Sequence, residues 1–422
     1  MRRPGLRADA ALVAIAAAGL AVRVVYTVRL GQHVDLGISD ADFYSGGANA
    51  LADGQGYIDV FRALQTGRAL PTAHHPPGWP AVLAVFSALG VESELGHRLV
   101  GCLVGAVAVF VVGRLGRRIG GRAVGLISAG LAALHPTLVA ADGSLMAETL
   151  SGLLVLLVLL AALRTVDRSS AARALLVGLT IGAAALVRGE ALLYLPLVVV
   201  PLAVCVARRS GRSVRALARV GGVATVGVVA LVLPWTARNL VQLDGFVLIS
   251  TNESTVLAGA NCDRTYYGSD VGGWQFDCVA RHPDPISEVE QAALWRRQGS
   301  TYLRQHTTRL PFVLTQRVLR TWGLRADPGP APEGRDAGVQ RVGSIVWVAA
   351  LLPLGTAGAV LVARRRSRIE LALLLAPVGA ATFISVAGFG MLRFRHTMEL
   401  VALVLTAVTV DALLGRLAGR GR

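Results

Sequence analysis

The sequence contains no lysine and few charged residues of any kind. All 42 of its Lys-plus-Arg positions are arginine, and Asp, Glu, Lys and Arg together make up 16% of the 422 residues. A soluble globular protein has about a quarter of its residues charged. Hydrophobic residues reach 54%, and several segments contain the roughly 20 apolar residues that span a bilayer. This balance excludes a soluble globular protein and predicts a polytopic membrane protein.

Cysteine is also scarce, with four residues in the chain. Cys102 and Cys205 lie in apolar runs, where cysteine behaves as a small buried hydrophobic residue. Cys262 and Cys278 lie in a polar stretch. We expect these two to be a candidate disulfide if that stretch faces an oxidising compartment.

The net charge of +16 could by itself indicate a nucleic-acid partner. The arginines, however, gather in short turns between apolar runs, such as "RLGRRIGGR", "ARRSGRSVRALAR" and "ARRRSR". Arginine clustered on one side of a membrane follows the positive-inside rule. We therefore expect no nucleic acid and a multi-pass protein of the cell membrane with both termini in the cytoplasm.

The apolar runs predict an all-α protein with about ten transmembrane helices, the first of which is retained rather than cleaved as a signal peptide. The expected spans are 9–30, 97–113, 122–141, 144–163, 172–188, 190–207, 217–236, 343–363, 369–389 and 397–415. We expect an N-terminal membrane domain (1–236) with a first external loop (31–96), a mixed extracytoplasmic loop domain (237–342) and C-terminal spans (343–422). The first loop contains "HHPPGWPAVLAVFSALG", whose apolar part is too short to span and predicts an interfacial helix.

Two carboxylates, Asp40 and Asp42, follow the first span in "SDADFYSGGANALADGQGY". Aspartate is a favoured cap at a helix N-terminus, so both residues could be structural. An ionisable residue at the edge of a membrane domain is also costly, which favours a functional role. Both interpretations stay open from the residues alone.

Basic residues on the same predicted face could contact an anionic substrate. His74 and His75 are adjacent, so they would bind one metal ion only awkwardly, and phosphate contact or a structural role fits them better. Arg188 beside Glu190 is either a neutralised pair or a phosphate ligand. The same two interpretations hold for Arg238 in "LPWTARNL".

The late motif "GMLRFRHTMEL" places Arg393 and Arg395 outside, against the positive-inside trend, and an anionic substrate would explain them. "HPTLVAADGSLMAETL" places Asp142 in an external turn and Glu148 inside the following span. Glu148 is the more unusual of the two because apolar residues flank it.

The order of these motifs resembles the GT-C superfamily of polyprenyl-phosphate-sugar glycosyltransferases. The branch with protein O-mannosyltransferases and the lipid A aminoarabinose transferase is the most similar. The matching segments cover most of the chain: "DADFYSGGANALADGQGY", "PTAHHPPGWP", "HPTLVAADGSLMAETL", "GLTIGAAALVRGEALLYLP", "LPWTARNLVQLDGFVLISTN" and "RFRHTMEL". "ISTNESTVLAGANCD" and the cysteine spacing resemble an actinobacterial subgroup of unassigned substrate.

The resemblance implies an outward-facing cavity and an acidic base in the first external loop. By its spacing to Tyr44, that base falls on Asp40. Relatives carry Asp-Glu at this point, but here Ala41 replaces the Glu, so Asp42 would supply a second carboxylate. The Lys-Pro of the aminoarabinose branch falls on His75-Pro76.

The same resemblance places the basic residue for the lipid phosphate on Arg188, with Arg238 or Arg395 as further phosphate ligands, and a membrane-embedded acid on Glu148. Tyr44, His74 and His75 would contact substrate.

The predicted function is a membrane glycosyltransferase, a hexosyl- or pentosyltransferase that moves a sugar from a polyprenyl-phosphate donor to an unidentified extracytoplasmic acceptor. Asp40 would take the acceptor proton, and attack opposite the phosphate would invert the anomeric centre. We expect burial to raise the pKa of Asp40 and so make it a better base. No cofactor is firmly expected, and a divalent metal ion is a variant of the mechanism. The alternatives are a membrane transporter and a noncatalytic GT-C-like subunit of cell-envelope assembly.

Overall fold

The computed structural model describes residues 4–34, 39–211, 213–280, 286–325, 334–365 and 368–418. Within these ranges the chain is helical and forms no strand, and one isolated bridge joins Ile58 to Pro71. The predicted all-α architecture is therefore confirmed.

Eight helical segments of the described chain are long and apolar enough to cross a membrane. They contain α1 (Pro4–Arg29), α5 (Glu94–Gly120), α8 (Glu148–Asp167), α10 (Val200–Arg209), α11 (Val214–Gln242), α16 and α17 (Ala337–Val346, Leu352–Arg365), α18 (Arg368–Ala387) and α19 (His396–Leu417). The turns that precede α10 and α19, η2 (Gly189–Leu193) and η6 (Leu392–Arg395), belong to their spans. Each of these eight segments overlaps one of the ten predicted spans.

The other two predicted spans differ from the expectation. The span at 122–141 is broken into α6 (Arg122–Leu134) and α7 (Pro136–Asp142), which meet at 61°. Pro136 causes the break, because proline removes a helical hydrogen bond and excludes the preceding residue from the helix. The span at 172–188 is α9 (Ala171–Val187), whose 17 residues rise about 26 Å, less than the roughly 30 Å of a hydrocarbon core.

Arg23, the charge that interrupts the first apolar run, stabilises this break. It is 1% exposed and donates hydrogen bonds to the carbonyls of Ala132 and Ala133 at 3.1 and 3.0 Å. Its Nε pairs with Asp142 Oδ2 at 2.6 Å. The carbonyls that the helix break leaves without partners are thereby satisfied, and the buried guanidinium is neutralised.

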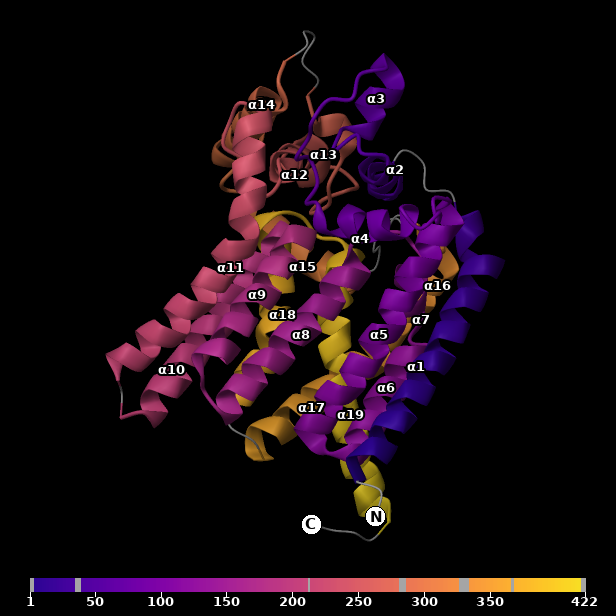
Figure 1. Ribbon diagram of the computed structural model, residues 1–422, viewed down its shortest axis with the longest axis vertical. Helices are drawn as coiled ribbons and strands as arrows, with labels where there is room; N and C mark the ends of the chain where they lie inside the picture. Colours follow the sequence, from indigo (N-terminus) through magenta and orange to yellow (C-terminus); the bar gives the residue numbers. More distant parts are fainter. Residues whose placement is uncertain are drawn as a thin grey trace.

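Shorter helices gather at the end of the bundle opposite the two termini (Figure 1). They are α2 (Asp40–Ala52), α3 (Val60–Thr66), α4 (Gly78–Ser87), α12 (Asn252–Gly259), α13 (Asp263–Tyr266), α14 (Glu288–Gln305) and α15 (Leu310–Thr321). Helix α4, the predicted interfacial helix, lies across the ends of the spans in Figure 1. Helix α2 packs on α4 through a cluster that includes Phe43, Tyr57, Trp79 and Leu83, and this packing fixes the position of the start of α2.

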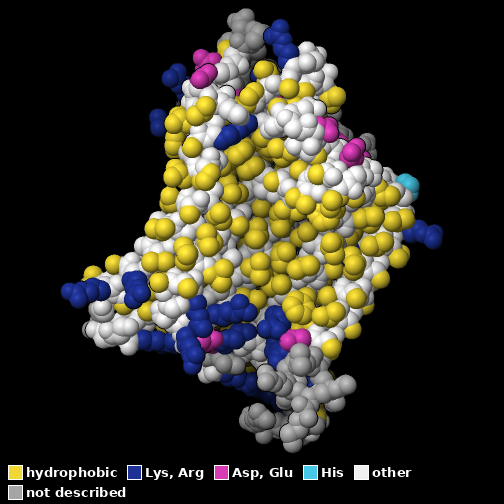
Figure 2. Space-filling view, viewed as in Figure 1, with side chains coloured by type: hydrophobic (Ala, Val, Ile, Leu, Met, Phe, Trp, Pro, Cys, Tyr) yellow, Lys and Arg dark blue, Asp and Glu magenta, His cyan; other side chains and the backbone are white. Residues whose placement is uncertain are grey.

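Figure 2 shows a belt of hydrophobic side chains around the middle of the molecule and arginines gathered at the end that carries the termini. A belt of this kind is the surface that a polytopic protein presents to lipid tails. The arginine ring below it agrees with the clustered arginines in the sequence.

Candidate functional site

The N-terminus of α2 separates the roles of its two carboxylates. Ser39 is the N-cap, and its hydroxyl accepts from Ala41 N, while Asp42 Oδ2 accepts from Ser39 N at 3.3 Å. This reciprocal pair is a capping box. Asp40 takes no part in the box, so its carboxylate is available for contacts with other segments.

The loop before α4 brings His75 to Asp40, with Nε2 at 3.4 Å from Asp40 Oδ1. The His75 ring packs against Phe43 and Tyr44, with ring centroids at 4.8 and 5.2 Å. Tyr57 donates its hydroxyl hydrogen bond to the His75 carbonyl at 3.0 Å. Ring packing and this hydrogen bond hold the His75 side chain against Asp40.

Two residues outside this loop anchor it. Arg238 donates to the carbonyls of Thr72 and Tyr57 at 2.6 and 2.7 Å. Glu288 of α14 accepts from Thr72 Oγ1 at 2.6 Å, Ala73 N at 3.1 Å and Thr251 Oγ1 at 2.8 Å. The segment that carries α12 and α14 is thereby docked onto the loop that precedes α4.

A chain of ion pairs extends from Asp40 into the bundle. Arg393 Nη1 lies 3.3 Å from Asp40 Oδ2, and its Nε lies 3.7 Å from Glu148 Oε1. Arg188 pairs with the same Glu148 oxygen at 2.7 Å and with Glu190 Oε1 at 2.5 Å. Both guanidinium groups lie over the Phe394 ring, at 5.7 Å from its centroid for Arg188 and 5.8 Å for Arg393.

The electrostatics of Asp40 differ from the expectation. Burial on its own would raise the pKa of the Asp40 carboxyl, but the facing His75 and Arg393 outweigh it and hold that pKa below its ordinary value. The predicted raised pKa of Asp40 is therefore wrong. Burial lowers the pKa of His75 to about 3, so the ring is uncharged at neutral pH and Arg393 supplies the positive charge beside Asp40. Burial also raises the pKa of Tyr44, which keeps its hydroxyl protonated.

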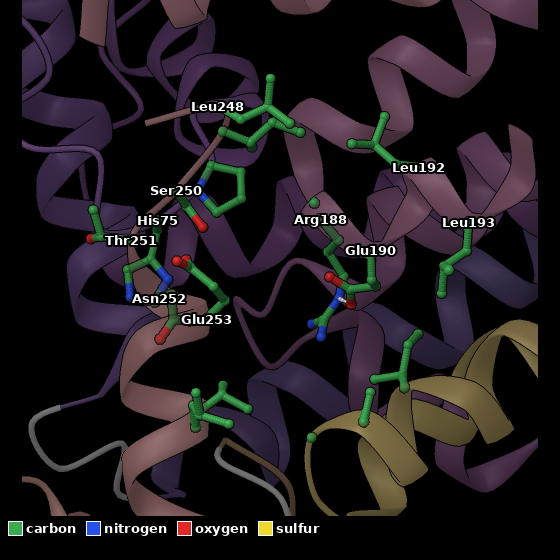
Figure 3. A pocket seen from close by; sticks show the side chains of 18 of the residues that line it. His75, Arg188, Glu190, Leu192, Leu193, Leu248, Ser250, Thr251, Asn252 and Glu253 are labelled. Carbon is green, nitrogen blue, oxygen red and sulfur yellow. Dashed lines mark hydrogen bonds and ion pairs between the residues drawn. The ribbon is translucent and has the colours of Figure 1, made fainter. Parts of the chain in front are cut away.

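These groups line a cavity of about 840 Å³, which Figure 3 shows from close by. Its charged lining consists of Asp40, Arg188, Glu190, Glu253, Arg296 and Arg393, with His75 and Tyr44 beside Asp40. The rest is largely apolar and includes Leu192, Leu193, Pro196, Phe246, Leu248, Phe383 and Ile384. A second cavity of about 40 Å³ is lined by Glu148 and shares Arg188, Glu190 and Arg393 with the first. Ligand sites have this character, with mostly apolar walls and a few convergent polar groups.

Four of the predicted site residues reach the large cavity: Asp40, Tyr44, His75 and Arg188. Glu148 lines the small one. Asp42 and His74 are not among the lining residues; Asp42 caps α2, and the His74 ring stacks edge-on against His75 at 4.7 Å.

The structure does not bring the other two predicted arginines to either cavity. Arg238 anchors the loop described above. Arg395 is fully buried, pairs with Glu399 at 2.6 Å and lies over the Trp347 ring. The motif "RFR" instead presents Arg393 to Asp40, because the two arginines of the turn η6 point into different surroundings.

Sequence reasoning considered Glu190 as a partner of Arg188 and preferred Arg395 to Arg393 as a phosphate ligand. It missed two charged cavity residues, Glu253 and Arg296. The external position of both arginines of "RFR" was the one signal for Arg393. Glu253 lies in a polar part of the sequence, and its spacing to other charged residues does not indicate a site.

Cys262 and Cys278 form a disulfide, with their Cα atoms 6.2 Å apart. It joins the start of α13 to the turn η4 (Phe276–Cys278) in the external segment. Cys102 and Cys205 are free, and Cys102 is buried in α5.

The residues around Asp40 do not fit a divalent metal ion. Within the described residues, no group of three or more His, Cys, Asp or Glu side chains could hold one. The two oxygens of Asp40 face His75 and a guanidinium, whereas hard cations require several oxygen ligands. No step of the chemistry is assigned to a metal.

Comparisons with known proteins agree with this fold. Residues 74–236 match the family model of dolichyl-phosphate-mannose-protein mannosyltransferases. No curated protein matches the sequence. Among solved structures, the archaeal oligosaccharyltransferase AglB from Archaeoglobus fulgidus, in complex with an inhibitory peptide and a dolichol-phosphate, is similar with a TM-score of 0.62 and 16% identity. The match covers 99% of this chain and 51% of that chain.

A second structure of the Archaeoglobus fulgidus enzyme, in complex with Zn and sulfate, has a TM-score of 0.57 and 15% identity over 97% of this chain and 50% of that chain. ArnT from Cupriavidus metallidurans bound to undecaprenyl phosphate has a TM-score of 0.46 and 17% identity, covering 96% and 78% of the two chains. The chain thus spans about half the length of the archaeal oligosaccharyltransferase. The resemblance to the GT-C superfamily is confirmed at the level of the fold, and the actinobacterial subgroup stays a prediction.

Proposed function

We propose that the protein is a membrane glycosyltransferase that transfers a sugar from a polyprenyl-phosphate donor to the hydroxyl group of an acceptor. The observation that carries this proposal is the cavity, whose lining combines the Asp40 carboxylate beside Arg393, a second arginine at Arg188 and a largely apolar wall. Dolichol-phosphate in the similar archaeal oligosaccharyltransferase supports a lipid-linked donor.

The apolar wall would take the prenyl chain. Phe246, Leu248 and Phe383 line the cavity and are 68%, 45% and 55% exposed, so apolar surface continues from the cavity toward the outside of the bundle. A hydrocarbon tail gains free energy from covering such surface.

Arg188 and Arg393 would bind the phosphate. Both pair with carboxylates, Arg188 with Glu148 and Glu190, and Arg393 with Asp40. A phosphate accepts the same bidentate hydrogen bonds as a carboxylate, so it can share or replace these partners. When Arg393 turns to the phosphate, the hold on Asp40 weakens and its pKa rises, which suits it to accept a proton.

The transfer step then follows from the positions of these groups. The acceptor oxygen forms a bond to the anomeric carbon while Asp40 takes the proton of the acceptor hydroxyl. The bond between the anomeric carbon and the phosphate oxygen breaks, and its electron pair leaves with the phosphate, whose added negative charge the arginines stabilise. Attack opposite the phosphate inverts the anomeric configuration.

We also propose that both termini are cytoplasmic and that the cavity opens on the extracytoplasmic side, with 237–342 as an external domain between the membrane domain 1–236 and the spans of 343–422. The arginine-rich end in Figure 2 supports this orientation.

The test uses purified protein in lipid nanodiscs with a polyprenyl-phosphate sugar and an extract of cell-envelope acceptors. Release of free polyprenyl phosphate, with the sugar recovered on an acceptor, is expected. In a parallel assay with the protein in sealed lipid vesicles, a donor that crosses the bilayer intact would instead indicate the transporter alternative. Failure of Arg188→Ala to weaken the binding of a short-chain prenyl phosphate would contradict the phosphate site.

A further inference from the structure

One carboxylate of the cavity has no close cationic partner among the described residues. Asp40, Glu148 and Glu190 each lie within 3.3 Å of an arginine. Glu253, by contrast, forms an ion pair of 3.8 Å, in which its Oε1 faces Arg296 Nη1. That separation is too long for a hydrogen bond.

The ion pair between Glu253 and Arg296 contributes little to the stability of the fold. Their side chains are 57% and 45% exposed, and an exposed ion pair of this length contributes little to stability. Both nevertheless line the cavity, Glu253 from the first turn of α12 and Arg296 from the middle of α14. Burial raises the pKa of Glu253, so this carboxylate holds a proton more readily than Asp40 does.

The cavity has two charged walls, which come from different segments of the chain and form different ion pairs. Figure 3 shows Glu253 and Asn252 on one side of the view and Arg188 and Glu190 on the other. The arginine wall belongs to the spans and takes the phosphate in the proposed function. The wall of Glu253 belongs to the external segment that Glu288 docks onto the first loop.

We propose that Glu253 and Arg296 bind the acceptor, that this acceptor is a saccharide, and that their contacts orient its hydroxyl group toward the donor. This inference rests on the proposed function. A carboxylate accepts hydrogen bonds from sugar hydroxyls and a guanidinium donates to them.

The surroundings favour a saccharide over a peptide. Asn252 and Ser250 add an amide and a hydroxyl group to this wall, and the Phe389 and Phe394 rings line the same cavity. Such rings can cover the apolar face of a sugar. The described residues offer no strand edge along which an extended peptide could pair.

The test is a binding experiment that needs no turnover. The full-length protein in detergent is titrated separately with a short-chain prenyl phosphate, with a panel of neutral disaccharides and with a Ser/Thr-containing peptide. The variants are Glu253→Gln and Arg296→Ala. Their controls are Glu92→Gln, an exposed glutamate of the first external loop, and Arg297→Ala, the exposed neighbour of Arg296 on α14.

We expect at least one disaccharide to bind the unaltered protein and both variants to weaken that binding about tenfold or more, as the loss of a charge-assisted hydrogen bond does. Both controls should bind the disaccharide normally, and prenyl phosphate should bind all five proteins alike. The inference is overturned if Glu253→Gln binds the disaccharide normally, if no disaccharide binds the unaltered protein, or if only the peptide binds. Failure of prenyl phosphate to bind would instead refute the proposed donor site.

Discussion

The two carboxylates at the start of α2 should respond in opposite ways to the same chemical change. Asp40→Asn removes the proposed base, and a positioned base contributes about 10²–10⁴-fold to the rate, or about 3–5 kcal/mol of activation free energy. Asp42→Asn keeps an oxygen that can accept from Ser39 N at the helix cap. It should leave the rate within about threefold, because a retained cap costs only a few tenths of a kcal/mol.

The structure also limits how much Asp40→Asn can destabilise the protein. The Asp40 side chain is 26% exposed, and its contacts to His75 and Arg393 are 3.4 and 3.3 Å long. Because His75 and Arg393 are only 4% and 12% exposed, losing this carboxylate costs about 1–3 kcal/mol. The loss of rate should therefore exceed the loss of stability.

The assay measures sugar transfer from a polyprenyl-phosphate donor by the two variants in nanodiscs, alongside their thermal unfolding. The expected result is a folded Asp40→Asn protein with a rate about a hundredfold or more below that of Asp42→Asn. Equal rates in the two variants would refute the base assignment. A slow, misfolded Asp40→Asn protein would show that the carboxylate is structural.

Three further predictions concern the charges around the cavity. In Arg393→Gln the pKa of Asp40 should rise, because the guanidinium that helps to hold this pKa below its ordinary value is gone. On the acid side of the pH profile, kcat/KM should therefore begin to fall at a higher pH than in the unaltered protein, and an unchanged acid limb would contradict this. Burial lowers the pKa of His75 to about 3, so the pH profile of kcat/KM should have no inflection near 6.5. An inflection there that disappears in His75→Gln would show that the His75 ring titrates. Glu288→Gln should lower the free energy of unfolding of the external segment by about 1–3 kcal/mol, since one carboxylate oxygen accepts from both Ala73 and Thr251. Limited proteolysis of the external segment measures this effect, and no change would contradict the docking role.

Much of the fold could be predicted because bilayer crossing depends on local composition. A run of about 20 apolar residues has few alternatives to a transmembrane helix, and all ten predicted runs are helical in the structure. The predicted spans differ from the structure where a single residue breaks the helix or where the helix ends early. Pro136 breaks one run, and α9 ends after 17 residues at Arg188.

The candidate site was predictable only in part. The sequence placed Asp40, His75 and Arg188 near one face, and the structure brings these residues to one cavity. It could not choose between Arg393 and Arg395, because both are external arginines in the same short motif. One of them pairs with Asp40, 353 positions away in the chain, and the other with Glu399, four positions away.

The sequence by itself determined that this chain crosses a membrane many times and that its charges are sorted between two faces. Both properties follow from the free-energy cost of moving charged and backbone polar groups into hydrocarbon. This cost applies to each segment independently of the others. Only the tertiary structure decided that Asp42 caps a helix while Asp40 faces an arginine, and that Glu253 stands on the opposite wall of the cavity. These roles depend on which side chains from distant segments meet, and residue spacing along the chain does not contain that information.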